Sequence, residues 1–278
     1  MSDAVKVLIS NIALPNSGIG SWTTRINRLL QQQPEVFDYI LSPSTSLPNA
    51  LFCNKRKFIT WYRPLRGIQL KTWIARDYLK ALRKVSKMHT KITVVVMDDP
   101  HLLEAIALYK TRLSSKVELI FSFHGFRLTI EEKLLQFVDK ILWLSKTAVE
   151  ESQLSYQVSL PKSIVVGNAV DSNIFFPLQK EAFRKARLDS NYKETDEVLI
   201  WMANDRPKKG FHIFESIVKE LLKTHKNLRV ITLGTTKVID HPKVKNVGRI
   251  PNEQLSKYLQ IGNYYIFNLW MINHLCCS

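Results

Sequence analysis

A basic loop follows a short apolar run near residue 200. The run from Val198 to Ala203 is rich in Leu, Ile and Trp, as a buried strand is. Arg206, Lys208 and Lys209 come next, and Gly210 opens a segment with helical periodicity. Cationic side chains and the positive end of a helix would then converge on one point. Such a loop can bind a phosphate and stabilise a departing diphosphate, although a solvated basic turn would also explain it.

Two earlier segments have ligand-binding chemistry of their own. Gly18 and Gly20 stand before the first expected helix, where a backbone can approach an anion closely. The third glycine of a dinucleotide-binding fingerprint is absent, and an ordinary turn is the simpler explanation. His124 follows an apolar run at the end of a parallel strand, the edge where such sheets bind ligands. It can hydrogen-bond a substrate hydroxyl or transfer a proton, and a purely structural histidine is the alternative.

A turn rich in Asn and Asp runs from Gly167 to Pro177. Asn168 and Asp171 lie in it, after the last strand of the first half of the chain. We expect these two residues at a cleft between domains. An interdomain turn capped by Asp171 would account for them equally well.

Most of the positive charge lies in one segment. Residues 53–91 hold twelve Lys and Arg against the single acid Asp77, so the segment contributes 12 − 1 = +11 of the formal +16. Within it, residues 71–88 have the periodicity of a helix with aromatic and aliphatic residues on one face. Such a surface suits an anionic membrane or acceptor, and a core-facing helix with a solvated basic back is the alternative. Nucleic-acid binding ranks below both, because no recognition motif accompanies the charge. The residues expected to form this patch are Arg63, Arg66, Trp73, Arg76, Lys80, Arg83 and Lys84.

Short apolar runs alternate with amphipathic ones, which predicts βαβ units and parallel sheets. We expect an α/β protein with two halves, residues 1–178 and 179–278. The expected strands are 5–10, 92–97, 117–123, 140–144 and 163–166 in the first half, and 198–203, 228–233, a segment near 247 and 264–267 in the second. The expected helices are 21–32, 71–88, 101–113, 130–138, 146–154, a short one within 180–193, 210–225 and 252–260.

The bulk composition is that of a folded protein, with 45% hydrophobic and 23% charged residues in 278. Cys53, Cys276 and Cys277 have neither metal spacing nor a disulfide pattern. No signal peptide precedes the first expected strand, and no apolar run approaches the roughly 20 residues of a membrane span. We therefore expect a cytoplasmic protein, peripheral at the inner face of the membrane if the basic segment binds lipid.

Together these segments resemble the family 4 glycosyltransferases (glycosyl transferases group 1), which are retaining enzymes of the GT-B fold. The matches keep the family's order along nearly the whole chain. Ala169 stands where the family usually has glycine. The matching stretches are Ser17-Gly-Ile-Gly20, Phe123-His-Gly125, Asp139-Lys140 with Leu144-Ser145, Gly167-Asn-Ala-Val-Asp171 with Phe175 and Pro177, Pro207-Lys-Lys-Gly210, and Val247-Gly-Arg-Ile-Pro251 with Leu255 and Tyr258.

The resemblance implies a GT-B-like fold of two Rossmann-like domains with parallel sheets. The first would bind a glycan or glycolipid acceptor and the second a nucleotide diphosphate sugar, with no metal or other cofactor. His124 would be the catalytic-site residue that contacts the reacting sugar. Gly18 and Gly20 would face the phosphates, and Lys209 would neutralise the leaving diphosphate.

Two departures from the family pattern bear on activity. The family's diphosphate-binding arginine falls on Asn204, and Arg206 is the nearest replacement. The family also has two glutamates eight positions apart, whereas the matching region, residues 268–278, contains neither. We therefore expect the second domain to be incomplete and the chain to be a truncated relative with weak or no activity. The alternative is a non-catalytic module that binds acceptor or membrane, such as one half of a split enzyme.

Overall fold

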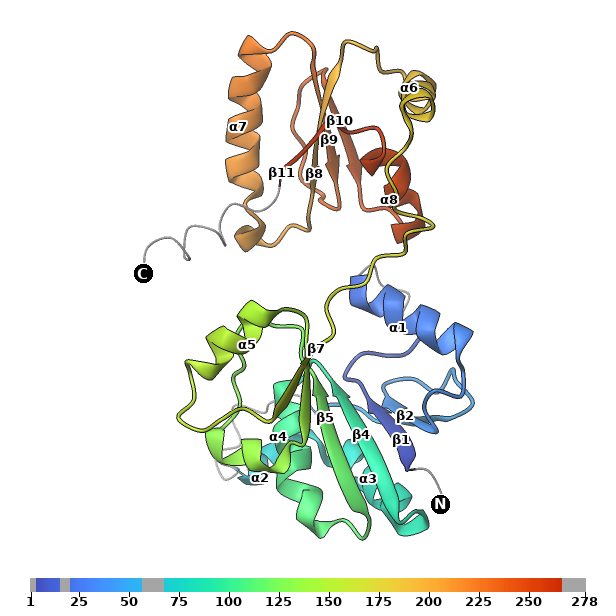
Figure 1. The fold of residues 1–278 in the computed structure, drawn as a ribbon, viewed down its shortest axis with the longest axis vertical. Coiled ribbons are helices and arrows are strands. Elements are labelled where there is room, and N and C mark those ends of the chain that lie inside the picture. Colours follow the sequence, from blue (N-terminus) through green and yellow to red (C-terminus); the bar gives the residue numbers. More distant parts are fainter. Residues whose placement is uncertain (1–3, 16–20, 57–67, 267–278) are drawn as a thin grey trace. The chain divides into compact units, whose positions relative to one another are not determined.

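The computed structural model describes residues 4–15, 21–56 and 68–266. They form two compact α/β units, which part between Ala169 and Val170 (Figure 1). The boundary expected after residue 178 lies slightly further along the chain. Within the described ranges, no helix is both long and apolar enough to cross a membrane.

Unit 1 is built on a parallel sheet of seven strands in the order β3-β2-β1-β4-β5-β6-β7. Val7 lies opposite Tyr39 on one side and Val94 on the other. Because all strands run the same way, the residues that follow them collect at one edge. The strands are β1 (Val5–Ile9), β2 (Tyr39–Ser42), β3 (Ala50–Phe52), β4 (Lys91–Met97), β5 (Lys116–Ser122), β6 (Lys140–Trp143) and β7 (Lys162–Val165).

Helices cover both faces of this sheet (Figure 1). On one face, Ile26 and Leu30 of α1 (Ser21–Gln32) pack with Leu8. On the other, α3 (Arg76–Met88) and α4 (Pro100–Tyr109) pack with alternate strand residues such as Val94 and Val96. Ser145 caps α5 (Lys146–Gln153) by accepting a hydrogen bond from the backbone N–H of Ala148.

Four details of unit 1 differ from the expectation. The single helix expected over 71–88 is two helices, α2 (Ile68–Ile74) and α3, because the carbonyl of Ile74 accepts from the backbone N–H of Arg56 at 3.0 Å. Strands β2 and β3 were missed, since both are short. The helix expected over 130–138 is a 3₁₀ helix, Glu132–Phe137, and the one expected to reach residue 113 gives way to a 3₁₀ turn, Lys110–Arg112, after α4.

Unit 2 has a parallel sheet of four strands in the described residues, in the order β10-β9-β8-β11. On one face Trp201, 2% exposed, packs against Phe211 and Phe214 of α7. Helices α6 and α8 cover the other face (Figure 1). The elements are α6 (Lys180–Asp189), β8 (Glu197–Met202), a 3₁₀ turn (Pro207–Lys209), α7 (Phe211–Thr224), β9 (Leu228–Leu233), β10 (Val244–Gly248), α8 (Asn252–Leu259) and β11 (Tyr264–Ile266).

Candidate functional site

His124 lies at the carboxyl edge of the sheet in unit 1, as its place after a strand predicted. Its backbone N–H donates to Asp98 Oδ1 at 2.8 Å, and its Nε2 lies 3.2 Å from Ser122 Oγ. The ring meets Trp22 edge to face, with centroids 5.7 Å apart. Nδ1 is buried and has no hydrogen-bond partner within the described chain. A buried polar atom of this kind lacks a partner that a ligand hydroxyl can supply.

The charge state of His124 follows from its surroundings. Burial lowers the pKa of the ring below its ordinary value, Asp98 opposes this shift, and Arg25 adds to it. The imidazole is therefore neutral at pH 7. A neutral ring can donate a hydrogen bond from one nitrogen and accept one at the other. This suits contact with a hydroxyl better than contact with an anion.

Two aspartates that directly follow β4 were not predicted from the sequence as site residues. Asp98 is exposed and has a left-handed backbone, with φ of 41°, which places its carboxylate over the backbone of His124. Asp99 is buried: Oδ1 accepts from the backbone N–H of Leu102 at 3.0 Å and thereby caps α4. Its Oδ2 accepts from Asn11 Nδ2 and from Lys55 Nζ, each at 2.7 Å. Asp99 thus ties together the segments that follow β1, β3 and β4.

The basic loop of unit 2 occupies the corresponding edge of the second sheet. It leaves β8 at Met202, passes through the 3₁₀ turn and enters α7 at Phe211. Asn204 Oδ1 accepts from the backbone N–H of Arg206 at 3.2 Å, so Asn204 shapes the loop. Gly210 has a left-handed φ of 68°, which favours glycine where the loop turns into α7. Within the described residues no acid forms an ion pair with Arg206 or Lys209.

Asp205, which was not predicted as a site residue, organises this loop. Its carboxylate accepts from Thr235 Oγ1 at 2.5 Å, from the backbone N–H of Thr236 at 2.9 Å and from Arg249 at 2.9 Å. These partners follow β9 and β10, so one side chain connects the ends of three strands. Lys237, the residue after Thr236, places its Nζ 5.5 Å from the ring of Phe211, the first residue of α7. More cations therefore gather at this edge than the loop itself provides.

The pKa of Asp205 determines the pH range over which its carboxylate connects the three strand ends. Hydrogen bonds from Thr235, Thr236 and Arg249 hold that pKa well below its ordinary range. Because the shift is downward, the connection is complete above the ordinary carboxyl pKa and is lost only as pH falls through the lower folded value. We expect the amide resonance of Thr236 to stay constant in NMR spectra from pH 7 to about 4. Asp205→Ala should displace it throughout that range. A shift in the wild-type resonance with an ordinary carboxyl midpoint would contradict this assignment.

The remaining predicted site residues fall in several places. Gly18, Gly20, Arg63 and Arg66 lie outside the described residues. Asn168 follows β7 in unit 1, and Asp171 in unit 2 forms a turn in which Oδ1 accepts from the backbone N–H of Asn173 at 3.0 Å. Nothing in these contacts assigns either residue a ligand. Trp73, Arg76, Lys80 and Arg83 line one groove on unit 1, whereas Lys84 does not line it.

Comparison with known proteins identifies the fold. No family model and no curated protein sequence matches the chain. HepE from Anabaena, solved with UDP and glucose, superposes with a TM-score of 0.61 at 10% identity, over 95% of this chain and 74% of that one. A glycosyltransferase from Rickettsia africae gives 0.63 at 14%, over 96% and 73%. The catalytic domain of starch synthase IV from Arabidopsis thaliana, bound to ADP and acarbose, gives 0.59 at 11%, over 96% and 78%. The chain therefore has the α/β GT-B fold, with a Rossmann-like parallel sheet in each unit.

Proposed function

We propose that the protein is a glycosyltransferase that uses a nucleotide diphosphate sugar as donor. The observation that carries the proposal is the chemistry of the two sheet edges in a GT-B fold. One edge presents a neutral histidine with an unpartnered buried nitrogen, and the other gathers Arg206, Lys209 and Lys237 around the start of α7. Neighbours in the same fold were solved with UDP, ADP or a UDP sugar analogue.

Each edge has a distinct part in this reaction. Departure of the nucleoside diphosphate builds negative charge on the bridging oxygen, and preorganised cations lower the energy of that state. Lys209 and the first turn of α7 take this role, and Asp205 holds the loop in place. His124 hydrogen-bonds a hydroxyl of the reacting sugar. The reaction proceeds with retention, and the acceptor is a lipid-linked sugar or a polysaccharide; the resemblance to family 4 supports both points.

The first experiment measures donor binding, which does not require the acceptor to be known. Calorimetric titration with UDP, GDP, ADP and UDP-glucose should give binding for at least one nucleoside diphosphate. Its monophosphate should bind roughly tenfold more weakly, because it makes fewer charge-assisted contacts. Absence of binding by every nucleotide at millimolar concentration would contradict the proposal. With an active acceptor, the anomeric configuration of the product by NMR tests retention.

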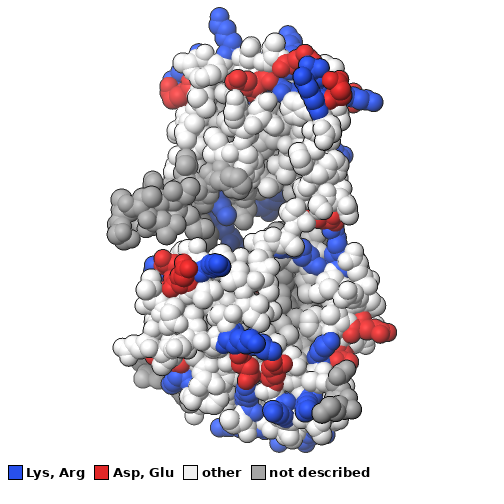
Figure 2. Space-filling model, in the orientation of Figure 1, with Lys and Arg blue, Asp and Glu red and all other residues white. Residues whose placement is uncertain are grey.

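We further propose peripheral contact with an anionic membrane, which the charge of the basic segment supports. Residues 53–91 carry +11 by count of Lys, Arg and Asp. On the face shown in Figure 2, however, Lys and Arg are interspersed with Asp and Glu over each unit. The excess positive charge thus forms no continuous basic surface on that face. Contact with lipid would therefore depend on a smaller site on the protein surface. A module that only binds acceptor or membrane is the second candidate, favoured by the groove on α2 and α3.

A further inference from the structure

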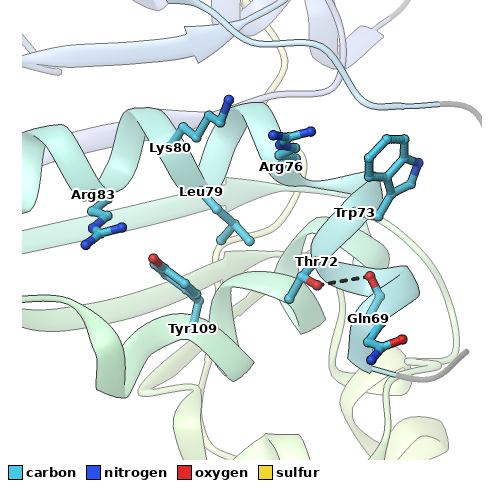
Figure 3. A pocket seen from close by; sticks show the side chains of 8 residues that line it. All are labelled: Gln69, Thr72, Trp73, Arg76, Leu79, Lys80, Arg83 and Tyr109. Carbon is cyan, nitrogen blue, oxygen red and sulfur yellow. Dashed lines mark hydrogen bonds between the residues drawn. The ribbon is translucent and has the colours of Figure 1, made fainter. Parts of the chain in front are cut away.

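A groove lies on unit 1 where α2, α3 and α4 meet, on the surface of the helices that cover one face of the sheet (Figure 3). Its volume is about 440 Å³, within the range of small-molecule sites. Arg83 and Tyr109 point toward each other across it, and Leu79 points into the space between the helices (Figure 3). The lining residues are Gln69, Thr72, Trp73, Arg76, Leu79, Lys80, Arg83 and Tyr109.

The floor of the groove is mostly apolar. Leu79, at 6% exposure, and the half-buried rings of Trp73 and Tyr109 form it. Trp73 is held by two guanidinium groups, with Arg56 4.3 Å and Arg76 5.7 Å from its ring centroid. Since cations already occupy this ring, it is poorly placed to stack on a nucleic-acid base.

The rim of the groove is cationic. Arg76, Lys80 and Arg83 are exposed and recur on one side of α3. No acid of the described residues pairs with them, whereas two nearby lysines are neutralised: Lys71 pairs with Glu104 and Glu131, and Lys110 with Asp139. The three rim charges therefore remain for a ligand from outside the chain.

An apolar floor beneath unpaired cations matches one class of partner. We propose that this groove binds an anionic phospholipid of a membrane surface, with the upper acyl segment on Leu79 and Tyr109 and the phosphate on Arg76, Lys80 and Arg83. The inference rests on the membrane contact proposed above and places it at a defined site. The apolar floor takes the acyl carbons while the rim cations contact the headgroup. Each cation near an anionic surface strengthens binding by about fivefold.

The test uses the full chain and vesicles of phosphatidylcholine, alone or mixed with phosphatidylglycerol, at low salt. We expect sedimentation with the mixed vesicles only, and release as salt is raised. R76Q/K80Q/R83Q should lower the partition coefficient by about a hundredfold. K185Q/K226Q/K257Q removes the same charge from three exposed lysines of unit 2 that form no ion pair within the described residues, and it should bind almost as well as the wild type. If both triple variants lost the same amount of vesicle binding, net charge alone would explain the effect, and the proposed site would be wrong.

Soluble ligands separate lipid from free phosphate and from nucleic acid. Dihexanoyl phosphatidylglycerol should shift NMR resonances of Leu79 and Tyr109, whereas glycerol 3-phosphate should bind much more weakly because it cannot use the floor. Equal affinity for the two would indicate a phosphate site and overturn the proposal. The proposal would also be overturned if an oligonucleotide bound the wild type but not R76Q/K80Q/R83Q, and vesicles bound neither protein. Donor binding is measured separately with nucleoside diphosphates, so failure of the groove and failure of the proposed function are distinguishable.

Discussion

Asp99→Ala is expected to lower the free energy of unfolding of unit 1 by about 3 kcal/mol. The substitution removes the cap of α4, worth about 1 kcal/mol. It also removes the charged acceptor shared by Asn11 and Lys55, and a hydrogen bond to a charged group is worth about 1.5–3 kcal/mol. Because the carboxylate is 3% exposed, water cannot replace it easily. Amide hydrogen exchange of β4 and β5 under increasing urea reports the stability of this unit alone.

Two further substitutions, Asp99→Asn and Asp98→Asn, show which interactions of Asp99 account for this loss of stability. Asp99→Asn keeps an oxygen for the backbone N–H of Leu102 but loses the charge that holds Lys55, so about half the loss is expected. Asp98→Asn changes the adjacent exposed carboxylate and should alter stability by less than about 0.5 kcal/mol. If Asp99→Ala were as stable as Asp98→Asn, the three segments would not depend on this carboxylate.

Lys209→Ala is expected to weaken nucleoside diphosphate binding by about 10- to 100-fold. The estimate corresponds to one charge-assisted hydrogen bond of roughly 1.5–3 kcal/mol. The backbone should keep its shape, because Gly210 and the Asp205 contacts set the course of the loop without this side chain. Calorimetric titration of the nucleotide that binds best to the wild type measures the change.

The matched control is Lys219→Ala. Lys219 lies on the same helix, α7, and is exposed, with Glu215 as its partner at 2.7 Å. It should leave nucleotide affinity within twofold of the wild type. Arg249→Ala should weaken binding through loss of an Asp205 partner, and by less than Lys209→Ala. Unchanged affinity in Lys209→Ala would remove this lysine from the donor site and leave Arg206 and Lys237 as the cations to test.

Most strands were predictable because their burial is a local property of the sequence. Strand β9, expected at residues 228–233, is Leu228–Leu233. Strand β3 was missed because three residues with weak alternation give no periodic signal. The break between α2 and α3 was also unpredictable: it depends on the backbone N–H of Arg56, which the helix sequence does not contain.

The sequence by itself determined that His124 would follow a strand and that Lys209 would lie in a loop between a strand and a helix that starts near Gly210. Both follow from short-range patterns of apolar and polar residues. Only the tertiary structure decided which side chains support them. Asp98 meets His124 across 26 positions, and Asp205 meets Arg249 across 44. Parallel strands bring the residues that follow them to one edge whatever their separation in the chain, so such contacts follow from strand order, which local sequence does not encode.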